Sequence, residues 1–200
     1  MIVTETFSIQ DGLFYDASSS SNVSKYTISS ANWTYDSTEQ AYKIFNTSKT
    51  WTDGTITGLT VPTDVELSFD VKIPYNNNGV YNQLIFGLKN SNDSNDIVGR
   101  ILLNSSTWKY QIICGKKLNG TETWATAVDS TTSYNNWVKF VISIKNGTLT
   151  LKLLDGSNVV ATDTLSVSDI TLGDSNPIKI NSIFNSSQGF YMKNILIKPL

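Results

Sequence analysis

Residues 137–154 read as two alternating strands joined by a two-residue turn, and this stretch constrains the fold more than any other. Every second position on each side of Asn146-Gly147 is apolar, and period-two alternation is typical of a strand with one buried face. An Asn-Gly pair accepts the positive φ angles of a type I′ turn, whose twist matches that of the flanking strands. The segment therefore predicts an antiparallel hairpin. Its inward positions are expected to be Val138, Phe140, Ile142, Ile144, Leu149, Leu151 and Leu153.

Similar short runs recur along the chain between clusters of Asn, Asp, Gly and Ser, whereas helical periodicity is almost absent. Residues 64–73 give the next clearest alternation, and Pro74 ends it because proline cannot donate a ladder hydrogen bond. Many short strands with turn signals between them predict an all-β antiparallel sandwich. The predicted strands are residues 2–7, 13–16, 24–28, 33–36, 41–46, 54–59, 64–73, 82–89, 97–103, 107–114, 122–125, 137–145, 148–154, 158–164, 178–184 and 190–198.

The composition sets limits on size, partners and compartment. No linker interrupts the 200 residues, so we expect one domain spanning 1–200. Only 16% of residues are charged, the net charge is -2, and Arg100 is the single arginine, which argues against a nucleic-acid partner. No run of about 18 apolar residues predicts a membrane span. The first residues lack the features of a signal peptide, which fits either a module excised from a secreted protein or a virion component.

Asn, Ser and Thr together make up roughly a third of the chain, far above ordinary usage. Two interpretations remain open: a solvated β surface, or a polar surface that meets glycans. The single cysteine, Cys114, cannot form an intrachain disulfide. It lies in an apolar run, and we expect it to be buried as a small hydrophobe.

Five parts of the chain carry a family resemblance: Thr6-Phe7 with Trp33, residues 66–73, residues 83–88, the hairpin at 136–156 and the closing run at 190–198. Together they resemble the concanavalin A-like lectin/glucanase jelly roll, a superfamily that includes laminin-G-like domains and many carbohydrate-binding modules. The resemblance covers most of the chain and implies a jelly-roll β-sandwich. Because that superfamily hosts enzymes, lectins, adhesion modules and virus tail modules, it does not fix the function.

Catalysis is not expected. Superfamily members that hydrolyse glycosides carry neighbouring carboxylates on one strand, and retaining chemistry needs two carboxyl groups about 5 Å apart. This chain has four glutamates and no histidine. Glu66 and Asp70 lie on one predicted strand but are four residues apart, about 13 Å at the rise of a β-strand. We expect them on a solvated face.

Calcium is the one metal that the sequence suggests, because superfamily sandwiches often hold a structural calcium ion. Residues 90–96 are rich in the oxygen ligands that calcium prefers. The run has no glycine and lacks the ordered spacing of an EF-hand loop, so an ordinary loop is the alternative. Asp11, Asp16 and Asp174 are looser candidates.

A candidate ligand face follows from strand parity. Gln83 is expected on the outer face of its strand, and Lys109 and Gln111 on the outer face of theirs, while Arg100 lies on the strand between them in sequence. If the three strands are neighbours, these side chains could line one polar concave face. Trp124, which is flanked by loops, could supply an aromatic surface for a sugar ring. A plain solvated sheet is the alternative.

The resulting prediction is a non-catalytic, lectin-like module that binds a glycan or polysaccharide, with no cofactor. The prediction that the ligand is a carbohydrate comes from the resemblance and not from a ligand-binding motif. The expected setting is extracellular, on a cell surface or in a virion, with other modules or virion subunits as further partners. The alternative is a structural or protein-interaction domain of a virus tail or adhesin. Trp137, at the start of the hairpin, is expected to pack and not to bind sugar.

Overall fold

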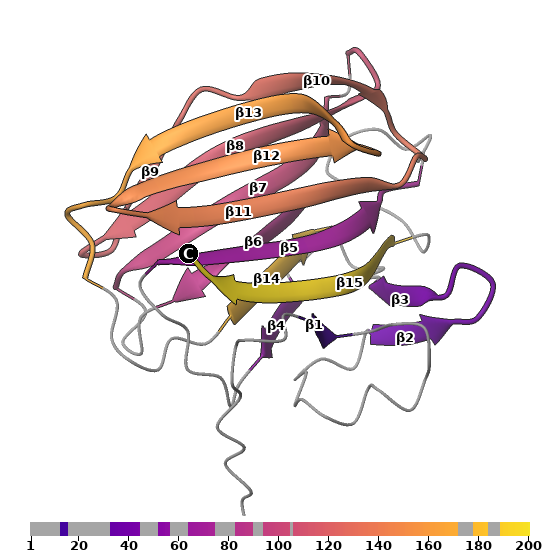
Figure 1. The fold of residues 1–200 in the computed structure, drawn as a ribbon, viewed down its shortest axis with the longest axis horizontal. Helices are drawn as coiled ribbons and strands as arrows, with labels where there is room; N and C mark the ends of the chain where they lie inside the picture. The colour runs from indigo at the N-terminus through magenta and orange to yellow at the C-terminus, as the bar shows by residue number, and fades with distance from the viewer. Residues whose placement is uncertain are drawn as a thin grey trace, which may run out of the picture.

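The computed structural model describes residues 13–15, 33–44, 52–56, 64–74, 83–89, 94–104, 106–171, 178–183 and 189–200. Within these ranges every regular element is a β-strand, and the strands form two antiparallel sheets stacked on each other (Figure 1). The predicted all-β antiparallel sandwich is therefore confirmed. The strands predicted at 2–7 and 24–28 lie outside the described residues. No described segment forms a helix long and apolar enough to cross a membrane.

The first sheet contains the predicted hairpin. Its strand order is β13 (Asn158–Ser166), β12 (Thr148–Asp155), β11 (Val138–Lys145), β5 (Val65–Lys72), β15 (Phe190–Pro199), β3 (Ala41–Ile44) and β2 (Trp33–Asp36), and β1 (Leu13–Tyr15) also pairs with β15.

The second sheet carries the strands of the candidate ligand face. Its order is β10 (Val128–Ser133), β8 (Lys109–Leu118), β7 (Asp96–Asn104), β6 (Gln83–Lys89), β14 (Ile178–Ile183) and β4 (Thr52–Ile56), and β9 (Thr121–Trp124) pairs with the far part of β8. The edge strands β10 and β13 lie beside each other and close one side of the sandwich (Figure 1).

The hairpin has the predicted register and turn. Lys145 is paired with Thr148, and Asn146 and Gly147 have φ angles of 49° and 70°. All seven expected inward residues of β11 and β12 are buried, as are the alternate residues of β5. Phe69 of β5 contacts Phe140 of β11 edge to face, with ring centroids 5.5 Å apart. The alternation seen in the sequence therefore marks one continuous apolar layer of the core.

Tyr110 fastens the two sheets together. It belongs to β8 of the second sheet and is fully buried. Its hydroxyl donates to the Asn136 carbonyl at 2.8 Å and accepts from the Ile73 amide at 3.0 Å. Ile73 directly follows β5, and Asn136 lies just before β11, so both partners belong to the first sheet's side of the sandwich. Burial raises the pKa of this phenol well above its usual value. The buried polar atom is thus fully satisfied, as a sandwich core requires.

Strand β10 was missed by the sequence analysis because two of its inward positions, those that follow Val128, are not apolar. Ser130 and Thr132 are both buried. The Ser130 hydroxyl donates to the Thr132 carbonyl at 3.1 Å, and the Thr132 hydroxyl donates to Asp155 at 2.9 Å. Hydrogen bonds therefore replace apolar packing along this edge, which hides the strand from a hydrophobicity pattern.

Candidate functional site

The three strands that carry Gln83, Arg100, Lys109 and Gln111 are neighbours, which meets the condition on which the candidate face depended. In β7, Ile97 and Ile101 are buried, and a Cβ atom at Gly99 would meet core side chains. Successive strand residues point to opposite faces, so Arg100 lies on the outer face of the second sheet. Gln111 lies on the same face, because its neighbours Tyr110 and Ile112 are fully buried.

The backbone register aligns the predicted positions across the sheet. Gln83 is paired with Leu102, which is itself paired with Gln111. Arg100 is paired with Ile113, one pair further along the same face. The structure thus places the four predicted sheet residues on three adjoining strands. For Gln83 this placement refers to its backbone, which is paired with that of Leu102.

Trp124 lies flat against the same face. The β8–β9 hairpin turns at Asn119 and Gly120, whose φ angles are 48° and 83°, and this turn pairs Trp124 with Gly115. A Cβ atom at Gly115 would lie only 2.4 Å from the indole atoms Cε3 and Cζ3. The ring therefore rests on bare backbone, and only glycine leaves room for it.

The indole also contacts the predicted arginine. The guanidinium carbon of Arg100 lies 4.0 Å from the centroid of the Trp124 ring, which is stacking distance for a cation on an aromatic face. The indole N–H donates to Glu122 at 3.3 Å. Arg100 and Trp124, called here the indole–guanidinium pair, therefore form one preassembled unit on the outer face.

The electrostatics of the pair are set by burial. Arg100 is half-buried, and its buried Nε has no hydrogen-bond acceptor among the residues that the structure describes. Desolvation lowers the pKa of Arg100 below its usual value, while the nearby charge of Glu122 acts in the opposite direction. A guanidinium remains protonated under such conditions, so the pair presents a permanent cation.

A second group, which the sequence analysis did not identify, holds Gln111. Asp129 of β10 accepts from the Gln111 side chain at 2.8 Å and from the Asn104 side chain at 2.9 Å. Lys109 is paired with Asn104 at the same end of the sheet. This group is centred four residues along β8 from Gly115, about 13 Å at the rise of a strand. Among the predicted residues whose side chains the structure describes, Arg100 and Trp124 are in direct contact, whereas Gln111 belongs to a separate group on the same face.

The carboxylates of this face are widely spaced. Glu122 and Asp129 are paired with Lys117 and Gln111, six residues apart along β8, or about 20 Å. Asp96 of β7 and Glu122 of β9 lie closer, because both are paired with Lys117 of β8, which stands between them. Their backbones are about 10 Å apart, the width of two strand spacings. On the first sheet, Glu66 and Asp70 share the outer face of β5 and are partly exposed, in agreement with the predicted separation.

Trp137 lies on the outer face of the first sheet, far from the indole–guanidinium pair. It is half-buried, with the Lys193 ammonium 4.0 Å and the Lys72 ammonium 5.6 Å from its ring centroid. Lys72 also forms an ion pair with Glu39. This ring packs within a cluster of long side chains, as expected for a residue at a strand start.

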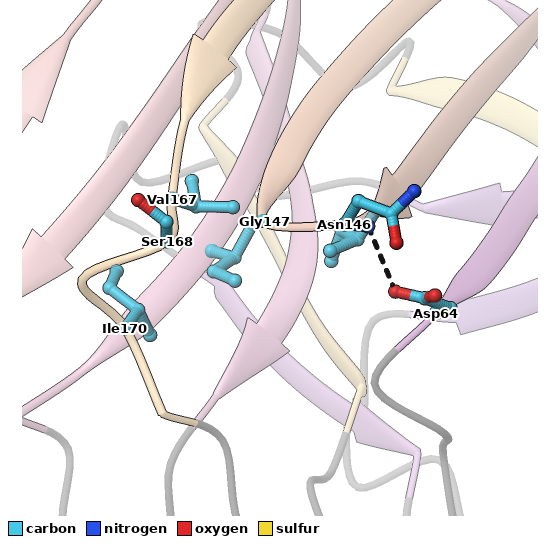
Figure 2. Close-up of a pocket in the computed structure, with 8 residues that line it drawn as sticks. Asp64, Asn146, Gly147, Val167, Ser168 and Ile170 are labelled. Atoms are coloured by element: carbon cyan, nitrogen blue, oxygen red, sulfur yellow. Dashed lines mark hydrogen bonds between the residues drawn. The ribbon is translucent and has the colours of Figure 1, made fainter.

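A pocket of about 290 Å³ opens at the turn end of the sandwich, next to the hairpin (Figure 2). Core residues Ile97 and Ile144 line it, and Asp64 lies at its rim. The Asp64 carboxylate accepts from the Asn146 amide at 3.1 Å (Figure 2), and the Gly147 carbonyl accepts from Val167 at 2.8 Å. The Asp64 carboxylate and the Gly147 carbonyl therefore support the turn from within the pocket lining.

Neither a nucleophile nor a metal centre is assembled in the described residues. Cys114 is fully buried, as predicted, and burial together with the nearby Asp163 carboxylate raises its pKa. In the part of the chain that the structure describes, no three His, Cys, Asp or Glu side chains are grouped to hold a metal ion. Asp11, Asp16, Asp174 and residues 90–93 of the calcium candidate loop lie outside that part.

Comparison with solved structures identifies the fold. The carbohydrate-binding module CBM66 of Bacillus subtilis superposes with a TM-score of 0.58 at 11% identity, covering 86% of this chain and 94% of its own. The CBM2 module of the evolved Dit protein of Lactobacillus casei BL23 phage J-1 gives 0.61 at 11% identity, covering 84% and 79%. The β-glucanase of Bacillus licheniformis gives 0.61 at 10% identity, covering 94% and 98%.

These matches confirm that the chain has the concanavalin A-like jelly-roll fold its sequence resembles. Neither a protein-family model nor a curated protein sequence matches the chain significantly. At such low identities the likeness establishes the architecture and leaves the ligand to be argued from the site.

Proposed function

We propose that this domain is a non-catalytic carbohydrate-binding module that holds its glycan on the outer face of the second sheet. The indole–guanidinium pair is the observation that carries the proposal. A sugar ring offers apolar C–H groups and a rim of hydroxyls, so it suits an aromatic surface bordered by planar polar side chains. Trp124 and Arg100 supply such a surface, and Gln111 and Asn104 supply planar amides further along it.

The neighbours in fold support the same class of ligand and an external setting. One solved neighbour is a carbohydrate-binding module, and another is a module of a phage Dit protein. We therefore propose that this chain acts outside a cell, on a cell surface or in a virion, beside other modules or virion subunits.

The spacing of the carboxylates supports a binding role over a catalytic one. Retaining glycosidases need two carboxyl groups about 5 Å apart and inverting ones about 6.5–9.5 Å, with room for a water molecule. Among the described side chains of the outer face, Asp96 and Glu122 are the nearest such pair, with backbones about 10 Å apart and Lys117 between them in the register.

The test is a glycan array run with the whole chain, with and without calcium. Trp124→Ala should abolish retention, because it removes the aromatic part of the surface. Trp137→Ala is the matched control, since it removes an indole from the other sheet, and it should retain binding. A chain that keeps its glycans after Trp124→Ala would contradict the proposed face. No retention on any glycan would favour the structural or protein-interaction role instead.

Catalysis is checked separately on any glycan that is retained. Prolonged incubation with that glycan should release no new reducing ends. Release that is abolished by Glu122→Gln or Asp96→Asn would overturn the non-catalytic part of the proposal.

A further inference from the structure

An arginine that serves only the structure is expected to have hydrogen-bond acceptors for its guanidinium, and Arg100 lacks one at Nε among the described residues. It lies on the outer face of β7, with strands on both sides, and is the single arginine of the chain. Buried polar atoms in folded proteins nearly always have a hydrogen-bond partner. The Nε of Arg100 is nonetheless buried without one, and among the described residues no carboxylate lies within ion-pair distance of its guanidinium.

The surroundings make the guanidinium a strong site for an anion. The position opposite Arg100 in β8 is Ile113, and its next outward neighbours along β7 are Val98 and Leu102. In apolar surroundings, an ionic hydrogen bond is less weakened by solvent than on an open surface. Glu122, the nearest acid, already accepts the hydrogen bond of the indole N–H.

Stacking on Trp124 does not use the N–H donors of Arg100 in hydrogen bonds. A guanidinium uses its flat face to stack on an aromatic ring, while its N–H groups point outward in its own plane. That edge has the fork geometry that matches a carboxylate, with two parallel hydrogen bonds. The indole therefore fixes the orientation of the fork before any ligand arrives.

Resting on the proposed function, we infer that the glycan is acidic and that the Arg100 fork binds a carboxylate on one of its sugars. Asp129 does not compete for this role, because it is engaged by Gln111 and Asn104 at the other end of the face. The carboxylate can belong to a uronic acid in a polysaccharide or to a terminal sialic acid, since both offer the same planar group.

The experiment measures binding of the whole chain to matched acidic and neutral probes by calorimetry. Polygalacturonate is compared with the same polymer after carboxyl reduction, and sialyllactose with lactose. The wild-type chain should bind one acidic probe at least tenfold more tightly than its neutral counterpart. Polygalacturonate and sialyllactose distinguish the two sources of the carboxylate.

Three variants separate the fork from charge in general. Arg100→Met keeps an unbranched side chain on the indole without charge or donors and should abolish the acidic preference. Arg100→Lys keeps the charge without the fork and should retain only part of it. Lys139→Met, an exposed cation on the first sheet, is the matched control and should change nothing.

The outcomes distinguish this inference from the proposed function. Equal binding of acidic and neutral probes by the wild-type chain would overturn the inference and leave glycan binding intact. An acidic preference that survives in Arg100→Met would overturn the role of Arg100. Binding to none of the four probes would overturn the inference, whereas only the absence of retention on the whole glycan array would overturn the proposed function as well. Because the first comparison uses the wild-type chain, it holds even if a variant folds poorly.

Discussion

Replacing Gly115 with alanine should displace Trp124 from the second sheet. The added Cβ atom would lie 2.4 Å from two indole carbons and 3.0 Å from a third, whereas ordinary contacts begin at 3.4 Å. The ring must therefore rise by about 1 Å or swing aside, because alanine cannot leave its backbone position in β8. Either movement weakens the contact with Arg100 and the hydrogen bond to Glu122.

The size of the effect follows from those two interactions. A partly exposed cation–π contact contributes about 0.5–1 kcal/mol, and a hydrogen bond contributes about 0.5–1.5 kcal/mol net. Alanine recovers about 0.4–1 kcal/mol by restricting the unfolded chain. We expect Gly115→Ala to lower the free energy of unfolding by about 1 kcal/mol, which lowers Tm by about 2–4 °C in a chain of this size.

A double-mutant cycle isolates the contact between Gly115 and Trp124. In a Trp124→Ala background no ring opposes the new methyl group, so Gly115→Ala should raise stability by about 0.4–1 kcal/mol. Chemical unfolding of the four proteins then gives a coupling free energy of about 1–2.5 kcal/mol. Additivity within about 0.5 kcal/mol would refute the argument that the indole rests on Gly115.

Three further predictions concern the core and the titrating groups. Gly99→Ala should lower the free energy of unfolding by about 1–3 kcal/mol by overpacking, since its Cβ atom would lie 2.7 Å from Leu151 Cδ2; unchanged thermal unfolding would contradict this packing. The buried Cys114, with its raised pKa, should resist iodoacetamide at about pH 8.5, the usual thiol pKa, and react once denatured; labelling of the folded chain would show that the thiol is accessible. The Lys116 ammonium lowers the pKa of the Asp169 carboxyl. The stability that this pair contributes is therefore fully present above the ordinary carboxyl pKa of about 3.9, and it is lost as the pH falls through the lowered pKa. In an NMR titration Lys116→Met should therefore raise the Asp169 midpoint, and an unmoved midpoint would exclude the ion pair as the cause.

The first sheet could be predicted because its information is local. Strands β5, β11 and β12 bury every second residue, and the Asn146-Gly147 turn fixes their register. Strand β10 could not be predicted in this way. Its inward hydroxyls are tolerated only because Asp155, at the end of β12, accepts one of their hydrogen bonds. That partner is brought near by the stacking of the sheets, which no local pattern records.

The candidate face was predictable in outline and not in its contacts. Parity correctly placed Gln111 on the outside. The expectation for Arg100 depended on the adjacency of β6, β7 and β8, which follows a simple meander. The contact between Arg100 and Trp124 depends on the β8–β9 turn, and that between Gln111 and Asp129 on the missed strand. The strand predicted at 107–114 begins two residues too early, because Trp108 lies in the turn before β8 with a φ of 57°.

Two glycines on neighbouring strands separate what determines the fold from what we propose determines the function. Gly99 faces inward, where its missing side chain lets Leu151 and Phe140 of the first sheet approach β7. Gly115 is paired with Val98, the residue before Gly99, and it faces outward. There its missing side chain lets Trp124 lie flat. Inward positions of any sandwich of this fold must pack against the opposite sheet. A binding module and a glucanase can therefore have the same types of inward residue while the residues on their outer faces differ. A change at Gly99 should therefore be detected in stability, whereas one at Gly115 should be detected above all in glycan binding.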